Sequence, residues 1–190
     1  MGHGRAAMTG DHGFGSLRHL GIRFAGSLRP GGPSPADAGW ADRWLSPTEQ
    51  RLFASMSGAD RRHAIAVARR LPGFVGAAEA EIPPPVMAAA LLHDVGKVDA
   101  GLGTCARVGA TIVAMAAGRA RVAGWASRPP RTWAGRLGRY ARHDELGATA
   151  LARAGADPLT VAWAKEHHLP PQRWSVAPEV GTALKAADGD

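Results

Sequence analysis

The sequence contains a single cysteine and no long hydrophobic run, and each of these shortages excludes a class of protein. Cys105 alone rules out an internal disulfide framework and a multi-cysteine zinc site, which indicates a reducing compartment, most simply the cytoplasm. The longest apolar run, residues 109–118, is well short of the roughly 20 residues that a membrane-spanning helix needs, and the N-terminus lacks the apolar centre of a signal peptide. We therefore expect a soluble, cytoplasmic protein without a transmembrane segment.

Aromatic residues make up only 6% of the chain, whereas alanine is abundant. The 190 residues suffice for one domain with its own core, and the 45% hydrophobic fraction, much of it alanine, favours closely packed helices over a core of large aromatic side chains. No segment has the alternating pattern of a strand, and no internal repeat is present. The composition predicts an all-α fold.

Glycine, proline and serine are concentrated at the start of the chain. The segment 29–35 (RPGGPSP) cannot form a regular helix, because glycine and proline both disfavour it. We therefore predict a flexible N-terminal segment at residues 1–35, followed by one helical domain at residues 36–190.

Caps and prolines predict where the helices of this domain begin and end. We expect Asp37 to cap a short helix, Ser46 to precede the next one, and Asp60 to cap a longer one. In the longer helix, one buried face is formed by His63, Ala66, Val67 and Leu71. The prolines at 83–85 open a helix that ends in a left-handed Gly96. Later helices are predicted at about 104–126, 144–154, 158–168, behind an Asp157 cap, and 179–188.

The motif LLHDVGK, residues 91–97, carries the first chemical signal. His93 and Asp94 are adjacent in the last turn of a helix, so their side chains point about 100° apart and can hold one site from two sides. An aspartate at a helix C-terminus faces the negative end of the helix dipole, which costs about 0.3–1 kcal/mol unless a cation compensates it. A metal ion would be such a cation. A surface aspartate beside a buried histidine would explain the same doublet.

Further motifs follow in an order that resembles the HD-domain superfamily of metal-dependent phosphohydrolases, from about Ser46 to the end of the chain. They are DRRHAIAVARR around His63, LLHDVGK, RHDELGA around His143, EHHLPP around His167 and His168, and ALKAADGD around Asp188. The resemblance implies an HD-domain helical bundle with a metal site between its helices. It implies that one ion is surrounded by His63, His93, Asp94 and Asp188, and that a second, where present, is surrounded by Asp94, His143, His167 and His168.

His143 and the His167–His168 pair resemble the two-metal branch of this superfamily, which includes HD-GYP and cyclic-di-AMP phosphodiesterases and diadenosine tetraphosphatases. The GYP signature is missing, because Leu169, Pro170 and Pro171 follow the pair, which argues against a cyclic-di-GMP substrate. His143 could instead belong to a polar helix start, and periodicity does not choose between His167 and His168.

Histidine and aspartate ligands without a thiolate suit one or two divalent transition metal ions, and Fe, Mn, Co, Ni and Zn are all compatible with them. Two ions about 3.5–4 Å apart would activate a water and hold the attacking and leaving oxygens of a phosphoryl transfer. The resemblance assigns catalytic roles to Asp94 and to Lys97, whose ammonium would hold a phosphate oxygen. A solvated lysine after a helix end is the alternative for Lys97.

Acidic residues are missing between Asp99 and Asp144, although the interval is rich in arginine and contains Trp125, Trp133 and Tyr140. The arginines are Arg107, Arg119, Arg121, Arg128, Arg131, Arg136, Arg139 and Arg142. We predict an Arg-rich insertion at about residues 104–142, which could form a lid whose arginines hold substrate phosphates, with Arg107, Arg139 and Arg142 as candidates. A solvated face, a nucleic-acid surface and a membrane-surface helix are the alternatives.

These features predict a phosphohydrolase, either a phosphomonoesterase or a phosphodiesterase or pyrophosphohydrolase, that acts on a nucleotide or a related phosphorylated small molecule. The alternative is a non-catalytic regulatory HD domain that binds a nucleotide, nucleic acid or partner through its Arg-rich segment. The 23 Lys and Arg against 16 Asp and Glu permit nucleic-acid binding but do not favour it, since a basic composition alone is weak support. No oligomeric state is predicted.

Overall fold

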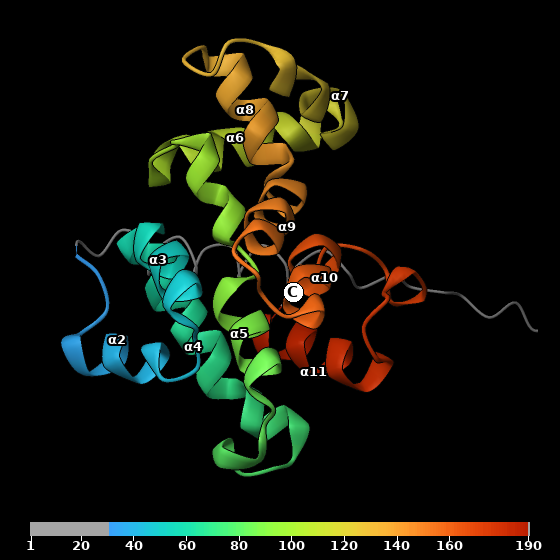
Figure 1. Cartoon of the computed structure of the whole chain (residues 1–190). Helices are drawn as coiled ribbons and strands as arrows, with labels where there is room; N and C mark the ends of the chain where they lie inside the picture. The colour runs from blue at the N-terminus through green and yellow to red at the C-terminus, as the bar shows by residue number, and fades with distance from the viewer. Residues whose placement is uncertain (1–30, 190) are drawn as a thin grey trace, which may run out of the picture.

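The computed structural model describes residues 31–189, apart from the side chains at positions 104, 105, 107, 108, 111 and 115. Most of the segment predicted to be flexible, and the side chains of Cys105 and Arg107, therefore lie outside the described residues. Within residues 31–189 the chain forms ten α-helices, four short 3-10 helices and no strand (Figure 1). The predicted all-α fold is confirmed. None of the described helices is both long and apolar enough to cross a membrane.

The helices follow one another with short connections. The α-helices are α2 (Pro35–Asp42), α3 (Pro47–Ser55), α4 (Gly58–Val75), α5 (Pro84–Leu92), α6 (Thr104–Ala117), α7 (Arg119–Ala123), α8 (Trp133–Ala141), α9 (His143–Arg153), α10 (Pro158–Glu166) and α11 (Pro178–Asp188). The 3-10 helices are η1 (Glu79–Glu81), η2 (Val95–Ala100), η3 (Gly124–Ser127) and η4 (Pro171–Arg173).

Serines, and not the predicted aspartates, cap α2 and α4. The backbone N–H of Asp37 donates to Ser34 Oγ, and that of Asp60 donates to Ser57 Oγ, both at 3.1 Å. Each aspartate stands three residues inside its helix and accepts a hydrogen bond from the same serine hydroxyl. Serine and aspartate are comparably good caps, so the prediction selected the right helices with starts three residues late.

The helix starts predicted at Ser46 and Asp157 are confirmed. Ser46 and Glu49 form a reciprocal capping box at the start of α3. Asp157 accepts a hydrogen bond from the backbone N–H of Leu159 at 2.8 Å, and Pro158 is the first residue of α10. Local patterns alone therefore place the starts of α3 and α10.

Gly96 is not the left-handed helix stop that the sequence suggested. The α5 helix ends at Leu92, the chain continues through η2, and the left-handed residue is Gly101, with φ 56°. A Cβ atom on Gly96 would collide with the backbone carbonyl of His143 and with the Gly147 nitrogen. Glycine at this position therefore lets α9 approach η2 closely, and this approach brings His143 beside Asp94.

The main core lies in the part that we call the body, formed by residues 31–99 and 142–189. Its central element is α5, in which every residue from Val86 to Leu92 is buried. The α4 helix contributes Val67 and Leu71 to this core, whereas Ala66, predicted on the same face, is exposed. Because α4, α10 and α11 all pack around α5, the ends of these helices converge on one side of it (Figure 1).

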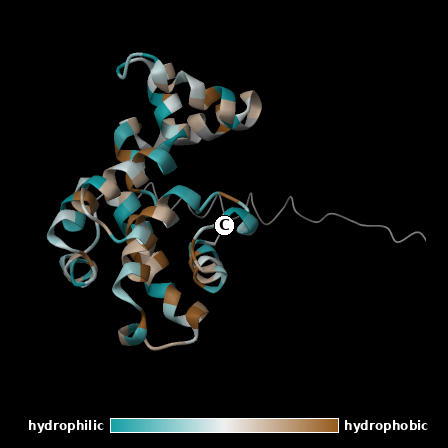
Figure 2. Ribbon diagram, turned by 45° about the vertical axis from the view of Figure 1, so that its right-hand side comes forward, coloured by the Kyte–Doolittle hydropathy of each residue, from teal (hydrophilic) through white to brown (hydrophobic). Residues whose placement is uncertain are grey.

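A smaller core holds together the part that we call the arginine-rich lobe, residues 100–141, which stands beyond α9 in Figure 1. The helical region predicted at 104–126 is divided here, because Gly118 has φ 86° and separates α6 from α7. The buried hydrophobic residues of this smaller core, among the side chains that the structure describes, are Ala100, Leu102, Ala110, Val122, Leu137 and Ala141. Helices of both parts carry mixed hydrophobic and hydrophilic residues, as Figure 2 shows.

Candidate metal centre

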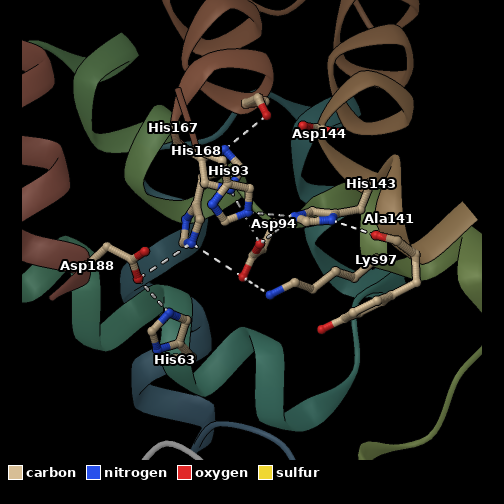
Figure 3. A network of polar contacts seen from close by, with 12 residues as sticks. His63, His93, Asp94, Lys97, Ala141, His143, Asp144, His167, His168 and Asp188 are labelled. Carbon is tan, nitrogen blue, oxygen red and sulfur yellow. Dashed lines mark hydrogen bonds and ion pairs between the residues drawn. The ribbon is translucent and has the colours of Figure 1, made fainter. Parts of the chain in front are cut away.

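The residues predicted as metal ligands meet at the side of α5 where several helices end (Figure 3). Only His63 comes from within a helix, α4. The others lie at or next to helix ends: His93 and Asp94 between α5 and η2, His143 at the start of α9, His167 and His168 after α10, and Asp188 at the end of α11. Residues 125 positions apart, such as His63 and Asp188, are thereby in contact.

Asp94 is at the centre of this group, and its two carboxylate oxygens face different partners. Oδ2 lies 3.4 Å from His93 Nε2 and forms an ion pair with Lys97 Nζ. Oδ1 lies 3.5 Å from His143 Nε2 and 3.8 Å from His167 Nε2. The carboxylate therefore stands between two sets of imidazole rings, as Figure 3 shows.

Two sets of side chains have the close spacing that a metal ion requires. In one set, His63, His93 and Asp94 each offer a ligand atom, and these atoms lie within 4.8 Å of one another. The same is true of His143, His167 and His168. Asp188 adjoins the first set, since its Oδ1 lies 2.9 Å from His63 Nε2 and 3.8 Å from His93 Nε2. Imidazole and carboxylate donors of this kind suit divalent transition metals.

Backbone carbonyls fix the orientation of the three buried histidine rings. The Nδ1 atoms of these rings hydrogen-bond to carbonyls of the preceding helical turn: His93 to Ala90 at 3.0 Å, His143 to Tyr140 at 2.8 Å, and His167 to Ala164 at 3.0 Å. A carbonyl only accepts hydrogen bonds, so each Nδ1 carries the proton and the Nε2 of a neutral ring presents a lone pair to the site. This arrangement is usual for histidines that bind metals.

Two of these Nε2 atoms have no hydrogen-bond partner among the described residues. They belong to His93 and His167, which are each only 2% exposed. Leaving a buried polar atom unsatisfied costs about 1–3 kcal/mol, and a metal ion would satisfy the His167 nitrogen directly and the His93 nitrogen once its proton has left. The residues present therefore fit a metal ion, on the basis of their donor chemistry and of these two orphaned nitrogens.

Charge interactions hold Asp94 ionised and His93 protonated in the absence of a metal. Burial by itself raises the pKa of the Asp94 carboxyl, but Lys97 and His93 outweigh burial and hold this pKa well below its usual range. Burial lowers the pKa of His93, but Asp94 and Asp188 outweigh it and raise this pKa to about 9. For Lys97, the attraction of Asp94 likewise exceeds the effect of burial, and its pKa is raised.

The second set of histidines is neutral near pH 7. Burial and the charge of Lys97 lower the pKa of His143 to about 4. Burial and His93 lower the pKa of His167 to about 3, and burial with the neighbouring rings also lowers the pKa of His168. Neutral imidazoles are the form that binds metals, so this set needs no deprotonation at neutral pH.

His63 and His168 lie at the rim of the site, whereas the other histidines are buried. The His63 side chain is 24% exposed, so its helix face is less buried than the sequence pattern predicted. His168 is an exposed residue, yet its Nε2 lies 3.1 Å from His143 Nε2. The structure thus brings both members of the histidine pair to the site, with His167 inside and His168 at the opening.

The arginines predicted as phosphate ligands show no polar contact with the histidines among the described residues, and their phosphate-binding role stays a prediction. Arg139 and Arg142 line a depression of about 340 Å³, together with Asp99, Ala126 and Leu146. Arg142 is paired with Glu145, and no hydrogen bond or ion pair among the described residues joins either arginine to the histidines. The side chain of Arg107, the third candidate, lies outside the described residues.

Arg119 contacts residues on both sides of a metal-ligand candidate, and the sequence did not single it out. Its Nη2 donates to Asp144 Oδ2 at 2.9 Å, and its Nε donates to the carbonyl of Ala141 at 3.2 Å. Both partners flank His143 in the chain. Arg119 follows Gly118, and a glycine inside a predicted helix is the signal that could have marked a break there.

Comparison with known proteins adds no relative, since no protein-family model, curated protein or solved structure matches the chain. The function must therefore be argued from the site. It combines a buried, ionised carboxylate, two sets of imidazole nitrogens and a lysine in contact with the carboxylate. This set can hold divalent cations and, beside them, an anionic substrate.

Proposed function

We propose that this protein is a metal-dependent phosphohydrolase of the HD type. Its substrate would be a phosphoester or phosphoanhydride of a nucleotide or a related phosphorylated small molecule. The observation that carries the proposal is the position of Asp94, whose Oδ2 faces His93 and Lys97 while its Oδ1 faces His143 and His167. A carboxylate so placed is suited to link two metal positions, and the order of the motifs in the sequence supports the same assignment.

The side chains of the two sets would hold the metal. His63, His93, Asp94 and Asp188 would hold one ion, and His143, His167 and His168 would hold a second with Asp94. One or two divalent transition ions bound there would supply Lewis acidity and lower the pKa of a coordinated water. The backbone carbonyls behind the rings keep the Nε2 atoms aimed at the ions, which limits the reorganisation needed on binding.

Lys97 would act on the substrate. Its Nζ contacts Asp94 Oδ2, and its side chain is 15% exposed, so the ammonium is at the site and still reachable from outside. Its raised pKa keeps it cationic throughout the neutral range. A fixed positive charge beside the carboxylate would hold a phosphate oxygen and stabilise the charge that develops in the transition state.

The proposal is tested with the purified chain loaded with manganese or iron and incubated with a panel of nucleotides. We expect release of phosphate or nucleoside monophosphate. In Asp94→Asn, which keeps the shape of the side chain but removes its charge, both metal affinity and hydrolysis should fall more than about 100-fold. Asp99→Asn, at an exposed position of the 3-10 helix η2 that Asp94 precedes, is the matched control and should match the wild type.

Two results would contradict the proposal. If Asp94→Asn retained bound metal and activity, Asp94 would not be a ligand. If the wild type bound metal but hydrolysed none of the nucleotides, the reading of the chain as a non-catalytic regulatory domain would replace it.

A further inference from the structure

Arg119 joins the arginine-rich lobe to the segment that presents His143. It is the first residue of α7, and it donates to the Ala141 carbonyl and to the Asp144 carboxylate. His143 lies between these two partners in the chain and is 5% exposed. The guanidinium is thus held next to a metal-ligand candidate by two hydrogen bonds from the same segment.

The contacts of Arg119 place it beside the second set of metal-ligand candidates. His143, which lies between the two partners of Arg119 in the chain, has its Nε2 3.1 Å from His168 Nε2 and 3.5 Å from Asp94 Oδ1. His168 is the exposed member of this set. Lys97 contacts Asp94 Oδ2, whereas Arg119 contacts the residues that flank His143, so the two cations adjoin different members of the cluster.

Arg119 also retains donors for a ligand. A guanidinium has five N–H donors in a planar fork. Contacts with the described residues engage its Nε and Nη2, and the side chain is 45% exposed. An arginine fixed by a carboxylate, with donors turned to solvent, is well suited to bind phosphate oxygens in pairs.

We propose that Arg119 forms a binding site for a second phosphate group, linked to the one held at the histidine and aspartate cluster. This inference rests on the proposed function and narrows its substrate to the class with two joined phosphoryl groups. Lys97 meets the phosphate at Asp94, and Arg119 meets the neighbouring phosphate beside the segment that presents His143. The arginine-rich lobe thereby contributes to recognition through one residue at its base.

Binding measurements test this inference independently of catalysis. The manganese-loaded full chain is titrated calorimetrically with methylenediphosphonate, which cannot be hydrolysed, and with inorganic phosphate. We expect the wild type to bind the diphosphonate more tightly than phosphate. Arg119→Ala should weaken diphosphonate binding about tenfold or more, because charge-assisted hydrogen bonds are lost, and should leave phosphate binding unchanged. Metal content is measured after each titration, because diphosphonates chelate metals.

Arg121→Ala is the matched control, since Arg121 is an exposed residue of the same helix, and it should bind both ligands like the wild type. Asp144→Asn breaks the ion pair but keeps the guanidinium, and should weaken diphosphonate binding less than Arg119→Ala does. The inference is overturned if Arg119→Ala binds the diphosphonate normally, or if Arg119→Ala and Asp144→Asn lose phosphate and diphosphonate alike, which would indicate a structural role. If the wild type prefers the diphosphonate through Arg119 but hydrolyses no phosphate compound, the proposed function is contradicted and the inference about Arg119 is kept.

Discussion

The body and the arginine-rich lobe differ in the size of the cores that hold them. Among the residues whose side chains the structure describes, twenty-six buried hydrophobic residues form the cluster of the body and six form that of the lobe, so the described core of the lobe has less apolar burial to stabilise it. Every metal-ligand candidate belongs to the body, although His143 follows the last helix of the lobe by two residues. The comparison indicates that the site is built on the part with the larger core.

Close backbone contacts at glycines occur in both parts, and they allow each part to be disturbed separately. Gly96 lies against the His143 carbonyl in the body, and Gly138 lies against the backbone of Ala126 within the lobe. A side chain at either position would force backbone atoms apart, which a packed interior accommodates poorly. Substitutions at these two glycines therefore test whether the two parts are as independent as their cores suggest.

The largest effect is expected for Gly96→Ala. The added methyl group should separate η2 from α9, lower the free energy of unfolding by about 3 kcal/mol, and displace His143 from Asp94 so that metal affinity falls as well. Denaturant unfolding and metal titration measure the two effects. Gly103→Ala is the control, because a Cβ there meets nothing within 4 Å. Normal metal affinity in Gly96→Ala would show that the close approach is not what positions His143.

A smaller and more local effect is expected for Gly138→Ala. The substitution should destabilise the lobe by about 2 kcal/mol while the body stays folded, because the clash is confined to η3 and α8. Hydrogen exchange should become faster in α6, α7 and α8 and remain unchanged in α4, α5 and α11. Faster exchange throughout the chain would mean that lobe and body unfold as one unit.

The last effect concerns pH, needs no substitution, and belongs to the body alone. Since the pKa of His93 is about 9 in the metal-free protein, binding of a metal must displace its proton. Metal affinity should therefore rise about tenfold per pH unit between pH 7 and pH 9 and level off above this pKa. Because His143 and His167 have pKa values of about 4 and about 3, they should add to the pH dependence only in acid.

Loss of the His93 proton has the opposite effect on the stability of the metal-free chain: it raises metal affinity but lowers this stability. The folded pKa of His93 lies above the ordinary value of 6.5, so its contribution to stability is complete below that value and is lost as the pH rises through about 9. Thermal unfolding without metal should show this decline, and Gly138→Ala should share it. Metal affinity that does not change between pH 7 and pH 9 would contradict a protonated His93.

Much of the fold was predictable because its signals are local. Serine, aspartate and proline at helix starts act on backbone groups two or three residues away, so the helices opened by Ser46 and by Asp157 could be placed from the sequence. The same rule misplaced the starts of α2 and α4 by three residues, since a serine and an aspartate competed for the cap. The ligand candidates were found because their residue types stand in short, ordered motifs.

Arg119 and Gly96 show what sequence reasoning could not find. The phosphate-binding role of Arg139 and Arg142 stays a prediction, and these two arginines line a depression with Asp99. Arg119 is more than 20 residues from His143 and reaches its flanking residues only because the lobe folds back on α9. Gly96 was assigned a local turn, whereas its reason is contact with a helix that begins far along the chain.

The sequence by itself determined the helical class, most helix starts and the kinds of donor that the site would contain, because these follow from interactions within about one helical turn. Only the tertiary structure decided which oxygen of Asp94 faces which histidine, that His167 is buried while His168 lies at the rim, and that Arg119 contacts Asp144 beside His143. These outcomes depend on how whole helices pack around α5. Packing brings together residues that are far apart in the chain, and their positions in the sequence do not indicate that they will be in contact.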